Sequence, residues 1–378
     1  MGLLDKYKTT LSKDKDISVE NLEPPRYFLH SGSYSLNKLI SGTLEGALPQ
    51  GRLIALGGHS SSGKSLVGAS AIGQVIRDGG IGIVVDSEGA LDNSYLQGCG
   101  VDTDSENFLR IGTSRIQKCS SVVNKFISEY KESGETTKVV ILVDSLDMLF
   151  TDSEQAKIDK EGELGGDQGQ RAKQLKRMLM SWVHSISSLN ITILCTKQVY
   201  QEQDQAKAYS EPWVFTSALE YAFSAIIIFE KLVFKEDKKG GEHLGFTLKA
   251  RTYKNRMARE KQVVRVEIPF DQGLDPFAGL IDNAVQYGVV EVRGAWHYLD
   301  DDTKVQGKKN AEANEEFMSR VLAATMEIDS KSREVHANLD DYISESESPT
   351  TGGESAAKRR KNKALKGLED DLDEDENG

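Results

Sequence analysis

At residues 58–65 the chain reads Gly-His-Ser-Ser-Ser-Gly-Lys-Ser, which fits the pattern G-x-x-x-x-G-K-[ST]. The apolar stretch Leu53-Ile-Ala-Leu56 precedes it, and a stretch compatible with a helix follows it. This order matters because the glycines let successive backbone N–H groups turn inward, while the following helix presents its positive end to the same anion. The stretch therefore predicts a phosphate-binding loop between a strand and a helix of an α/β sheet.

The residue types within this loop predict individual roles. Lys64 is expected to reach the β- and γ-phosphates of a nucleotide, and the Ser65 hydroxyl is expected to bind Mg²⁺. A flexible glycine turn is the alternative, which the flanking strand and the Lys-Ser pair disfavour. The residues predicted to bind the nucleotide are Gly58, His59, Ser60, Ser61, Ser62, Gly63, Lys64 and Ser65.

Length and composition narrow the class of protein. With 378 residues, of which 38% are hydrophobic, the chain can form one principal globular domain with appendages. It has no apolar run near the roughly 20 residues that cross a bilayer and no secretory signal, so a cytoplasmic protein without a membrane partner is expected. Cys99, Cys119 and Cys195 lack metal-ligand spacing and are expected to be reduced thiols.

The order of apolar stretches predicts the fold class. Strands without period-2 alternation indicate a mostly parallel sheet that is buried on both faces, as in α/β proteins. Two stretches that alternate better, 244–250 and 262–269, indicate an antiparallel extension at the sheet edge. The predicted parallel strands are 52–57, 81–86, 139–144, 190–196 and 224–230, and the predicted helices are 64–78, 116–133 and 170–189.

Composition divides the chain into four predicted parts. These are an N-terminal arm and linker at 1–30, a core at 31–275, a small C-terminal subdomain at 276–344 and a disordered acidic tail at 345–378. The formal net charge of −12 argues against broad attraction to nucleic acid, so the distribution of charge matters more than its sum. The tail is either simply solvated or competes with DNA for basic loops.

Two acidic strand ends complete the predicted site. Lys138-Val-Val-Ile-Leu-Val-Asp144 is an apolar strand that ends in an acid, the form of a Walker B element, and Asp144 is expected to hold Mg²⁺. Asp86-Ser-Glu88-Gly-Ala-Leu-Asp92-Asn-Ser-Tyr95 follows another strand and places Glu88 beyond the carboxyl edge of the sheet. Glu88 is the candidate for orienting or deprotonating the attacking water, with a place beside a helix N-cap as the alternative.

These motifs, in this order and spacing, resemble the RecA family of homologous-recombination ATPases. Residues 161–175, Glu-Gly-Glu-Leu-Gly-Gly-Asp-Gln-Gly-Gln-Arg-Ala-Lys-Gln-Leu, are similar to the first DNA-binding loop of that family and the helix after it. The resemblance covers about residues 31–290. Within the family, the runs 39–43 and 269–282 and the acidic C-terminus are most similar to the recombinases of T-even-type bacteriophages.

The resemblance implies a RecA-like P-loop NTPase core that uses ATP and Mg²⁺. Glu88 matches the catalytic glutamate of the family, and Asp92 and Tyr95 match the positions that contact adenine. Lys254 and Arg256 match a basic pair that reaches into the ATP site of the neighbouring subunit. Without the resemblance, this pair reads as a solvated basic turn.

The γ-phosphate sensor of the family falls on Lys197 or Gln198. Gln198 is favoured, because an amide can bond both the phosphate and the loop that follows. That loop and an earlier one, at about 199–217 and 152–169, are the stretches that the resemblance assigns to single-stranded DNA. Aromatic groups interleaved with cations suit unpaired bases and their phosphates.

Nine residues near these two loops are predicted to bind DNA. They are Lys157, Lys160, Arg171 and Lys173 at the first loop, and Tyr200, Lys207, Tyr209, Trp213 and Phe215 at the second. A small hydrophobic cluster is the alternative for Trp213 and Phe215.

The resemblance implies an ATP-dependent DNA recombinase that forms helical filaments on single-stranded DNA and pairs it with homologous double-stranded DNA. It further implies a DNA-dependent ATPase that yields ADP and phosphate and leaves AMP open as a further product. Implied partners are other copies of the chain, a recombination mediator and a single-strand-binding protein, in the host cytoplasm if the chain is phage-encoded. A hexameric RecA-fold helicase and an ATP-switched regulatory DNA-binding module are the alternatives.

Overall fold

The structure, a computed structural model, describes residues 2–11, 24–161, 168–203, 212–234, 245–269 and 273–346. Lys207, Tyr209, the middle of the predicted first loop and nearly all of the predicted tail lie outside these ranges. Among the described helices, none combines the length and hydropathy that a bilayer crossing requires. The three cysteines are buried and unpaired, as expected.

The centre of the chain is an eight-stranded sheet with the order β12-β11-β10-β3-β7-β6-β4-β5. The six strands from β10 to β5 are parallel, and β11 and β12 extend the sheet in antiparallel pairs. This confirms the predicted α/β fold and its antiparallel edge. The strands are β3 (Leu53–Gly58), β4 (Ile81–Asp86), β5 (Phe108–Gly112), β6 (Val139–Asp144), β7 (Ile191–Lys197), β10 (Ala225–Phe234), β11 (Gly245–Asn255) and β12 (Val263–Pro269).

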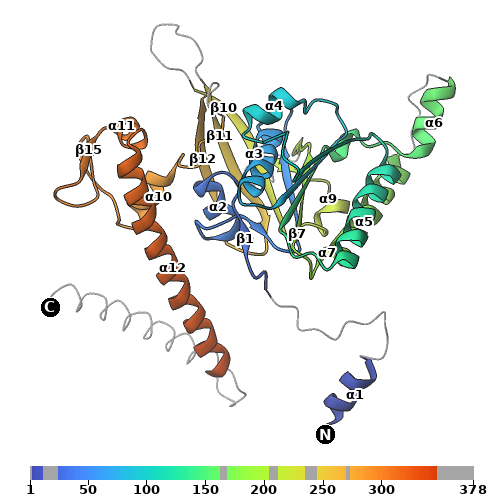
Figure 1. The fold of residues 1–378 in the computed structure, drawn as a ribbon, viewed down its shortest axis with the longest axis horizontal. Helices are drawn as coiled ribbons and strands as arrows, with labels where there is room; N and C mark the ends of the chain where they lie inside the picture. The colour runs from blue at the N-terminus through green and yellow to red at the C-terminus, as the bar shows by residue number, and fades with distance from the viewer. Residues whose placement is uncertain are drawn as a thin grey trace. The chain divides into compact units, whose positions relative to one another are not determined.

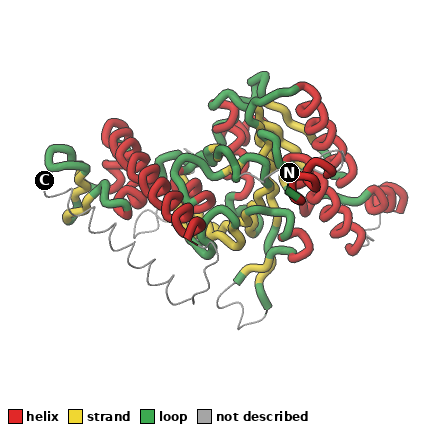
Figure 2. The backbone as a smooth tube through the Cα atoms, turned by 90° about the horizontal axis from the view of Figure 1, so that it is seen from below, coloured by secondary structure: helices red, strands yellow, loops and turns green. Residues whose placement is uncertain are grey.

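Helices cover both faces of this sheet (Figures 1 and 2). Because side chains alternate along a strand, Ile54 and Leu56 of β3 enter one hydrophobic cluster, and Leu53 and Ala55 enter the other. The first cluster includes α2 (Tyr34–Ser41), α3 (Lys64–Arg77) and α4 (Asn93–Gly98), and the second includes α5 (Ile116–Ser133), α7 (Gln168–Ile186) and α9 (Ser217–Glu220). Burial of both strand faces explains the continuous apolar runs in the sequence.

The region after the sheet contains strands that the sequence did not predict. A third cluster there contains Phe317, Met318 and Val321 together with Leu280 and Ile281. Its elements are α10 (Leu280–Gln286), β13 (Glu291–Arg293), β14 (Trp296–Tyr298), β15 (Lys304–Gln306), α11 (Lys308–Glu312) and α12 (Glu315–Ser346). The three strands form a small antiparallel sheet, and each is only three residues long, which is too short for a periodic signal.

The remaining described elements are short. They are α1 (Leu3–Leu11), β1 (Phe28–Leu29), β2 (Leu48–Pro49), η1 (Leu146–Met148), α6 (Asp152–Glu161), β8 (Tyr200–Gln201) and β9 (Trp213–Val214). The chain divides into two compact units, Met1–Glu327 and Ile328–Gly378. The part boundaries expected from composition stay predictions.

Gly73 of α3 lies against the backbone at Gly100, where an added Cβ would overlap the carbonyl oxygen. We expect Gly73→Ala to lower the free energy of unfolding by about 1–3 kcal/mol, because the backbone has to shift although alanine is the better helix former. Gly98→Ala, at the end of α4, is the matched control, since nothing lies within 4 Å of a Cβ added there. Urea unfolding compares the two, and an equal stability for both variants would contradict the close approach.

Candidate nucleotide-binding site

The loop between β3 and α3 has the backbone of a phosphate cradle. Gly63 adopts the left-handed conformation with φ 93°, and a Cβ there would come within 2.9 Å of Leu248. A Cβ on Gly58 would overlap the Ser62 hydroxyl. Ser61 also has a positive φ, of 57°, which few non-glycine residues adopt outside functional turns. Glycine is therefore favoured at Gly58 by close contacts that include the Phe229 carbonyl oxygen, and at Gly63 by its left-handed backbone.

Lys64 begins α3 and folds back over this loop. Its Nζ donates to the carbonyl oxygens of Gly58, at 3.1 Å, and His59, at 2.6 Å. Burial lowers the pKa of Lys64, and the nearby Asp144, Glu88 and Asp147 carboxylates oppose that shift. The cation thus lies inside the loop, where the predicted phosphate would bind.

Asp144 ends β6 and is buried next to the start of α3. It accepts a hydrogen bond from the Thr196 hydroxyl of β7, and the Ser65 hydroxyl also bonds to it. Burial raises the pKa of Asp144, and the hydrogen bonds from Thr196 and Ser65 act against that shift. A buried carboxylate beside a hydroxyl is a pair of oxygen donors that a magnesium ion would match.

Glu88 follows β4 on a turn that another carboxylate holds. Asp86 accepts hydrogen bonds from the backbone N–H groups of Glu88 at 3.1 Å, Gly89 at 2.7 Å and Leu91 at 3.2 Å. The Ser145 hydroxyl donates to Glu88 Oε1 at 2.7 Å. The exposed Glu88 side chain is therefore fixed from β4 and from the end of β6.

Asp92 and Tyr95 lie on the next turn. Asp92 is the N-cap of α4, and its Oδ1 accepts from the Tyr95 N–H at 2.8 Å. Burial raises the pKa of Tyr95, whose ring is partly exposed. Glu88 itself caps no described helix, so the alternative of a capping role falls to Asp92 instead. Contact of Asp92 and Tyr95 with adenine stays a prediction.

The residues of this edge fit a nucleotide with Mg²⁺. The Ser62 hydroxyl is buried and has no hydrogen-bond partner among the described residues, which is unusual for a buried polar atom. It lies in the glycine cradle described above, beside the Lys64 cation. The Ser65 and Asp144 oxygens supply the hard donors that Mg²⁺ prefers.

The two candidates for the γ-phosphate sensor differ in their surroundings. Lys197 is buried, and its Nζ forms an ion pair with Asp147 Oδ1 at 2.6 Å. Gln198 is the next residue, and its side chain is exposed at the end of β7. Its backbone N–H donates to Asp147 Oδ2 at 2.6 Å. Gln198 is thus the candidate whose side chain is available to a ligand.

Lys254 and Arg256 lie at the amino ends of the parallel strands, whereas the phosphate loop lies at the carboxyl end of β3. The Arg256 N–H donates to Ser224 O at 3.0 Å, and the Ser224 N–H donates to Leu53 O at 2.9 Å, at the start of β3. The loop begins after Gly58, about 16 Å along that strand at roughly 3.3 Å per residue. Neither cation can therefore reach the phosphate loop of its own protomer.

The two cations also differ in their local contacts. Lys254 Nζ donates to Glu220 O at 2.6 Å and lies 5.9 Å from the Tyr221 ring centre. Burial lowers the pKa of Lys254, and the Arg256 charge adds to that shift. The Arg256 side chain is exposed and forms no ion pair with a described residue. Arg256 is the freer of the two to reach a ligand outside its own protomer.

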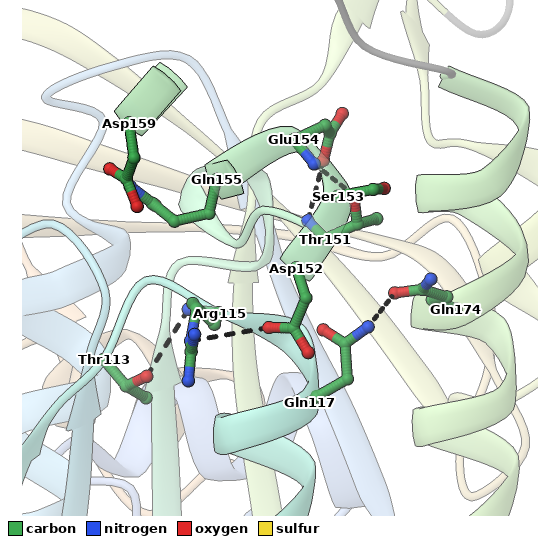
Figure 3. Close-up of polar contacts among 10 residues, drawn as sticks. All are labelled: Thr113, Arg115, Gln117, Thr151, Asp152, Ser153, Glu154, Gln155, Asp159 and Gln174. Carbon is green, nitrogen blue, oxygen red and sulfur yellow. Dashed lines mark hydrogen bonds and ion pairs between the residues drawn. The ribbon is translucent and has the colours of Figure 1, made fainter. Parts of the chain in front are cut away.

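The predicted first DNA loop begins as a helix, which corrects the expectation of a loop over 152–169. Thr151 and Glu154 bond reciprocally across the start of α6, at 2.7 and 3.1 Å, and form a capping box (Figure 3). Arg115 pairs with Asp152 at 3.4 Å beside this turn. The capping signature Thr-Asp-Ser-Glu at 151–154 could have revealed this helix in the sequence.

The predicted cations of this region have different surroundings. Lys157 and Lys160 are exposed on α6, and Lys173 is exposed on α7. Arg171 instead donates to the Asp147 carbonyl oxygen and lies 5.5 Å from the Phe150 ring centre. Three of the four cations are thus open to a ligand, while Arg171 joins α7 to the end of β6.

Two short strands near the ends of the predicted second loop, β8 and β9, pair in an antiparallel two-stranded ribbon. Tyr200 of β8 is 59% exposed. The Trp213 ring of β9 meets the His59 ring of the phosphate loop edge-on, with centroids 4.6 Å apart. Phe215 is fully buried and packs against Phe223, so its predicted contact with DNA is wrong and the hydrophobic cluster is correct. A ring inside the core cannot stack on a base.

Four further polar residues of this edge were not predicted. Thr196 donates to the Asp144 side chain, and Ser145 donates to the Glu88 side chain. Asp86 holds the turn that carries Glu88, and Asp147 accepts the hydrogen bond from the N–H group just after β7. Each stands within three residues of the end of a parallel strand. Polar residues at adjacent strand ends are the signal that could have found them.

A glycine cradle, an inward lysine and an acidic strand end on a mostly parallel sheet define a P-loop nucleotide-binding α/β protein. The sequence model of the family described as "RecA N-terminal domain" matches residues 18–275. The chain therefore belongs to the RecA family. This family comprises DNA-dependent ATPases and recombinases that use ATP with Mg²⁺ and form filaments on DNA.

Whole-length relatives agree with this assignment. The chain is 27% identical over 332 residues to Protein RecA of Staphylococcus epidermidis, which covers 85% of this chain and 87% of the relative. It is 27% identical over 322 residues to Protein RecA of Lactobacillus johnsonii, covering 84% and 83%. It is 28% identical over 324 residues to Protein RecA of Staphylococcus aureus, covering 84% and 86%.

The raised pKa of Asp144 predicts how its removal changes stability. Its folded pKa exceeds the unfolded one, so its contribution to stability falls as pH rises through the interval between them. We therefore expect Asp144→Asn to raise Tm at pH 7 without nucleotide or metal, and the gain to shrink as pH approaches the ordinary value of about 3.9.

Thermal unfolding at several pH values measures this difference. Asp301→Asn is the control, because that side chain is 95% exposed, and its Tm should match the wild type. A Tm of Asp144→Asn at or below the wild-type value at pH 7 would contradict the buried, costly charge.

Proposed function

We propose that this chain is an ATP-dependent DNA recombinase that assembles as a right-handed helical filament on single-stranded DNA. The filament would then pair that strand with homologous duplex. Within the family we propose a recombinase of the UvsX type, as in T-even-type bacteriophages, acting in recombination, repair and recombination-dependent replication. Family membership over 18–275 supports the general proposal, and the runs at 39–43 and 269–282 support the finer one.

The observation that carries the proposal is the separation of Lys254 and Arg256 from their own phosphate loop. The Arg256 backbone bonds at the start of β3, whereas the loop follows its end. A cation so placed can stabilise phosphate charge only in a neighbouring protomer, so hydrolysis depends on assembly. The free Arg256 guanidinium is the better candidate for that contact, with Lys254 beside it.

The residues at the other edge would bind and activate ATP. Backbone N–H groups of the loop and Lys64 would hold its phosphates, and Gln198 would sense the terminal one. Ser65 and Asp144 would hold Mg²⁺, which neutralises phosphate charge and orients it. Glu88, fixed by Asp86 and Ser145, would orient the attacking water and accept its proton.

The exposed cations and aromatic side chains near the two loops would bind single-stranded DNA. Lys157, Lys160 and Lys173 would neutralise phosphates, and Tyr200 would offer a ring for stacking. Trp213, Lys207 and Tyr209 stay predicted contacts of the second loop. Such binding reads no sequence, so specificity would come from base pairing with the second DNA.

Self-assembly has support at the far edge of the sheet. The strand β5 is the last in the sheet order, so its outer side is unpaired among the described strands. Leu109 of β5 is 49% exposed beside an apolar groove of about 180 Å³ between β5 and α5. An open sheet edge can accept a strand from a second copy, and the N-terminal arm is the proposed contributor. A mediator and a single-strand-binding protein remain proposed partners in the cytoplasm.

The helicase alternative shares the phosphate loop and a cation from the neighbour. The run 86–95 and the stretch 161–175 favour the recombinase over it. A purely regulatory module is disfavoured by the joint presence of Lys64, Ser65, Glu88 and Asp144, since such a module needs no catalytic set.

The proposed trans contact can be tested by ATP hydrolysis with and without single-stranded DNA. We expect Lys64→Ala to abolish turnover, and Arg256→Ala to lower the DNA-stimulated kcat by about 100-fold or more, with nucleotide affinity within about threefold. Arg259→Ala is the matched control, an exposed arginine of the same turn without a predicted role.

A mixture of the two inactive variants separates a contact in trans from one in cis. Lys64→Ala protomers still carry Arg256 and can complete the sites of Arg256→Ala protomers, so partial recovery of turnover is expected. No recovery on mixing, or equal loss of turnover and nucleotide affinity in Arg256→Ala, would argue against the contact between protomers.

A further inference from the structure

Asp147 lies in η1, three residues after the Asp144 carboxylate, and belongs to no motif of the sequence. Its carboxylate accepts two hydrogen bonds from the end of β7. One oxygen pairs with Lys197 Nζ at 2.6 Å, and the other accepts from the Gln198 N–H at 2.6 Å. One side chain thus holds both residues that directly precede the second predicted DNA loop.

The Lys197 cation gives this contact its strength. The Lys197 side chain is only 6% exposed, and the Asp147 side chain is 21% exposed. A buried cation is stable only with a partner, so Lys197 fixes Asp147 in this position as much as the reverse. The second oxygen of the carboxylate then accepts the hydrogen bond from the Gln198 backbone, which ties the position of Gln198 to this ion pair.

The backbone of Asp147 makes a further link, to the exit of the first predicted loop. Its carbonyl oxygen accepts a hydrogen bond from the Arg171 guanidinium, near the start of α7. The guanidinium also lies 5.5 Å from the centre of the Phe150 ring, three residues beyond Asp147. Asp147 is therefore bonded both to a residue just after the first loop and to the residues just before the second.

The same residue is close to the phosphate site. The Asp147 carboxylate is near enough to Lys64 to oppose the lowering of its pKa. Ser145, two residues earlier, donates to Glu88 at 2.7 Å. On β9, Trp213 contacts His59 of the phosphate loop, and Gln198, which Asp147 holds, lies just before the other strand of the ribbon.

We propose that Asp147 is a positioning residue that sets the Gln198 side chain toward the phosphate site and transmits the state of both DNA loops to it. This inference rests on the proposed function and adds a role for a residue outside the catalytic set. An isolated counter-ion for Lys197 would need only one oxygen, whereas Asp147 uses both oxygens and its backbone carbonyl.

The test separates positioning from simple charge compensation. Asp147→Ala leaves Lys197 buried without its partner, so it should lower Tm as well as the DNA-stimulated kcat. The double variant Asp147→Ala/Lys197→Met removes the stranded cation and should recover Tm. Its Gln198 remains untethered, so we expect its DNA-stimulated kcat to stay at least about tenfold below wild type, with KM for ATP within about threefold.

A second readout needs neither DNA nor ATP. The Trp213 ring is half-buried on the ribbon, whereas Trp182 is fully buried and Trp296 is 38% exposed. Acrylamide quenching of tryptophan fluorescence therefore reports the ribbon once the signal of the matching Trp213→Phe variant, which retains Trp182 and Trp296, is subtracted. We expect stronger quenching of Trp213 in the double variant. Asp282→Asn is the control, because it removes an ion pair, 2.8 Å to Lys308, away from this edge.

The outcomes distinguish this inference from the proposed function. A double variant with wild-type DNA stimulation and wild-type quenching would overturn the positioning role and leave Asp147 a counter-ion. A wild-type protein that single-stranded DNA does not stimulate would overturn the proposed function, and increased quenching in the double variant would still support the tether. Loss of stimulation with increased quenching and a recovered Tm is the expected result.

Discussion

The carboxyl ends of β3, β4, β6 and β7 meet at one edge because these strands are parallel neighbours, and the rest of the site depends on this convergence. Asp144 is the last residue of β6, and the phosphate loop, Glu88 and Gln198 follow β3, β4 and β7. The centre of the edge is the buried Asp144 carboxylate, which joins α3 through Ser65 and β7 through Thr196. Its raised pKa reflects a charge held away from water, and a cation beside it would relieve that cost.

The antiparallel strand β11 explains why one protomer is incomplete. It runs opposite to its neighbour β10, so its carboxyl end, with Lys254 and Arg256, reaches the amino edge of the parallel strands. The groups that bind the nucleotide therefore lie at the carboxyl ends of the parallel strands. The cations that would stabilise its developing negative charge lie at the amino ends. Stacking of protomers is the simplest way to bring the two edges together, and it makes hydrolysis a property of the assembly.

The parts of this protein with strong local signals could be read from the sequence. The β3, β4 and β6 strands and the α3 and α5 helices were predicted closely, because buried strands are continuous apolar runs and the glycine motif marks a turn. Phe215 was predicted to bind DNA, with a hydrophobic cluster as the alternative, because its burial depends partly on Tyr253 of β11, which only the fold brings beside it. Asp147 was not predicted, because its partners come from β7 and α7 and only the fold brings them together.

The central claim is that ATP, DNA and self-assembly are coupled in one filament. The most direct measurement is negative-stain electron microscopy of the protein with single-stranded DNA, Mg²⁺ and a slowly hydrolysed ATP analogue. The account predicts continuous helical filaments along the DNA, formed with the nucleotide and lost without it. Closed rings, or protomers that assemble neither on DNA nor with each other, would contradict it.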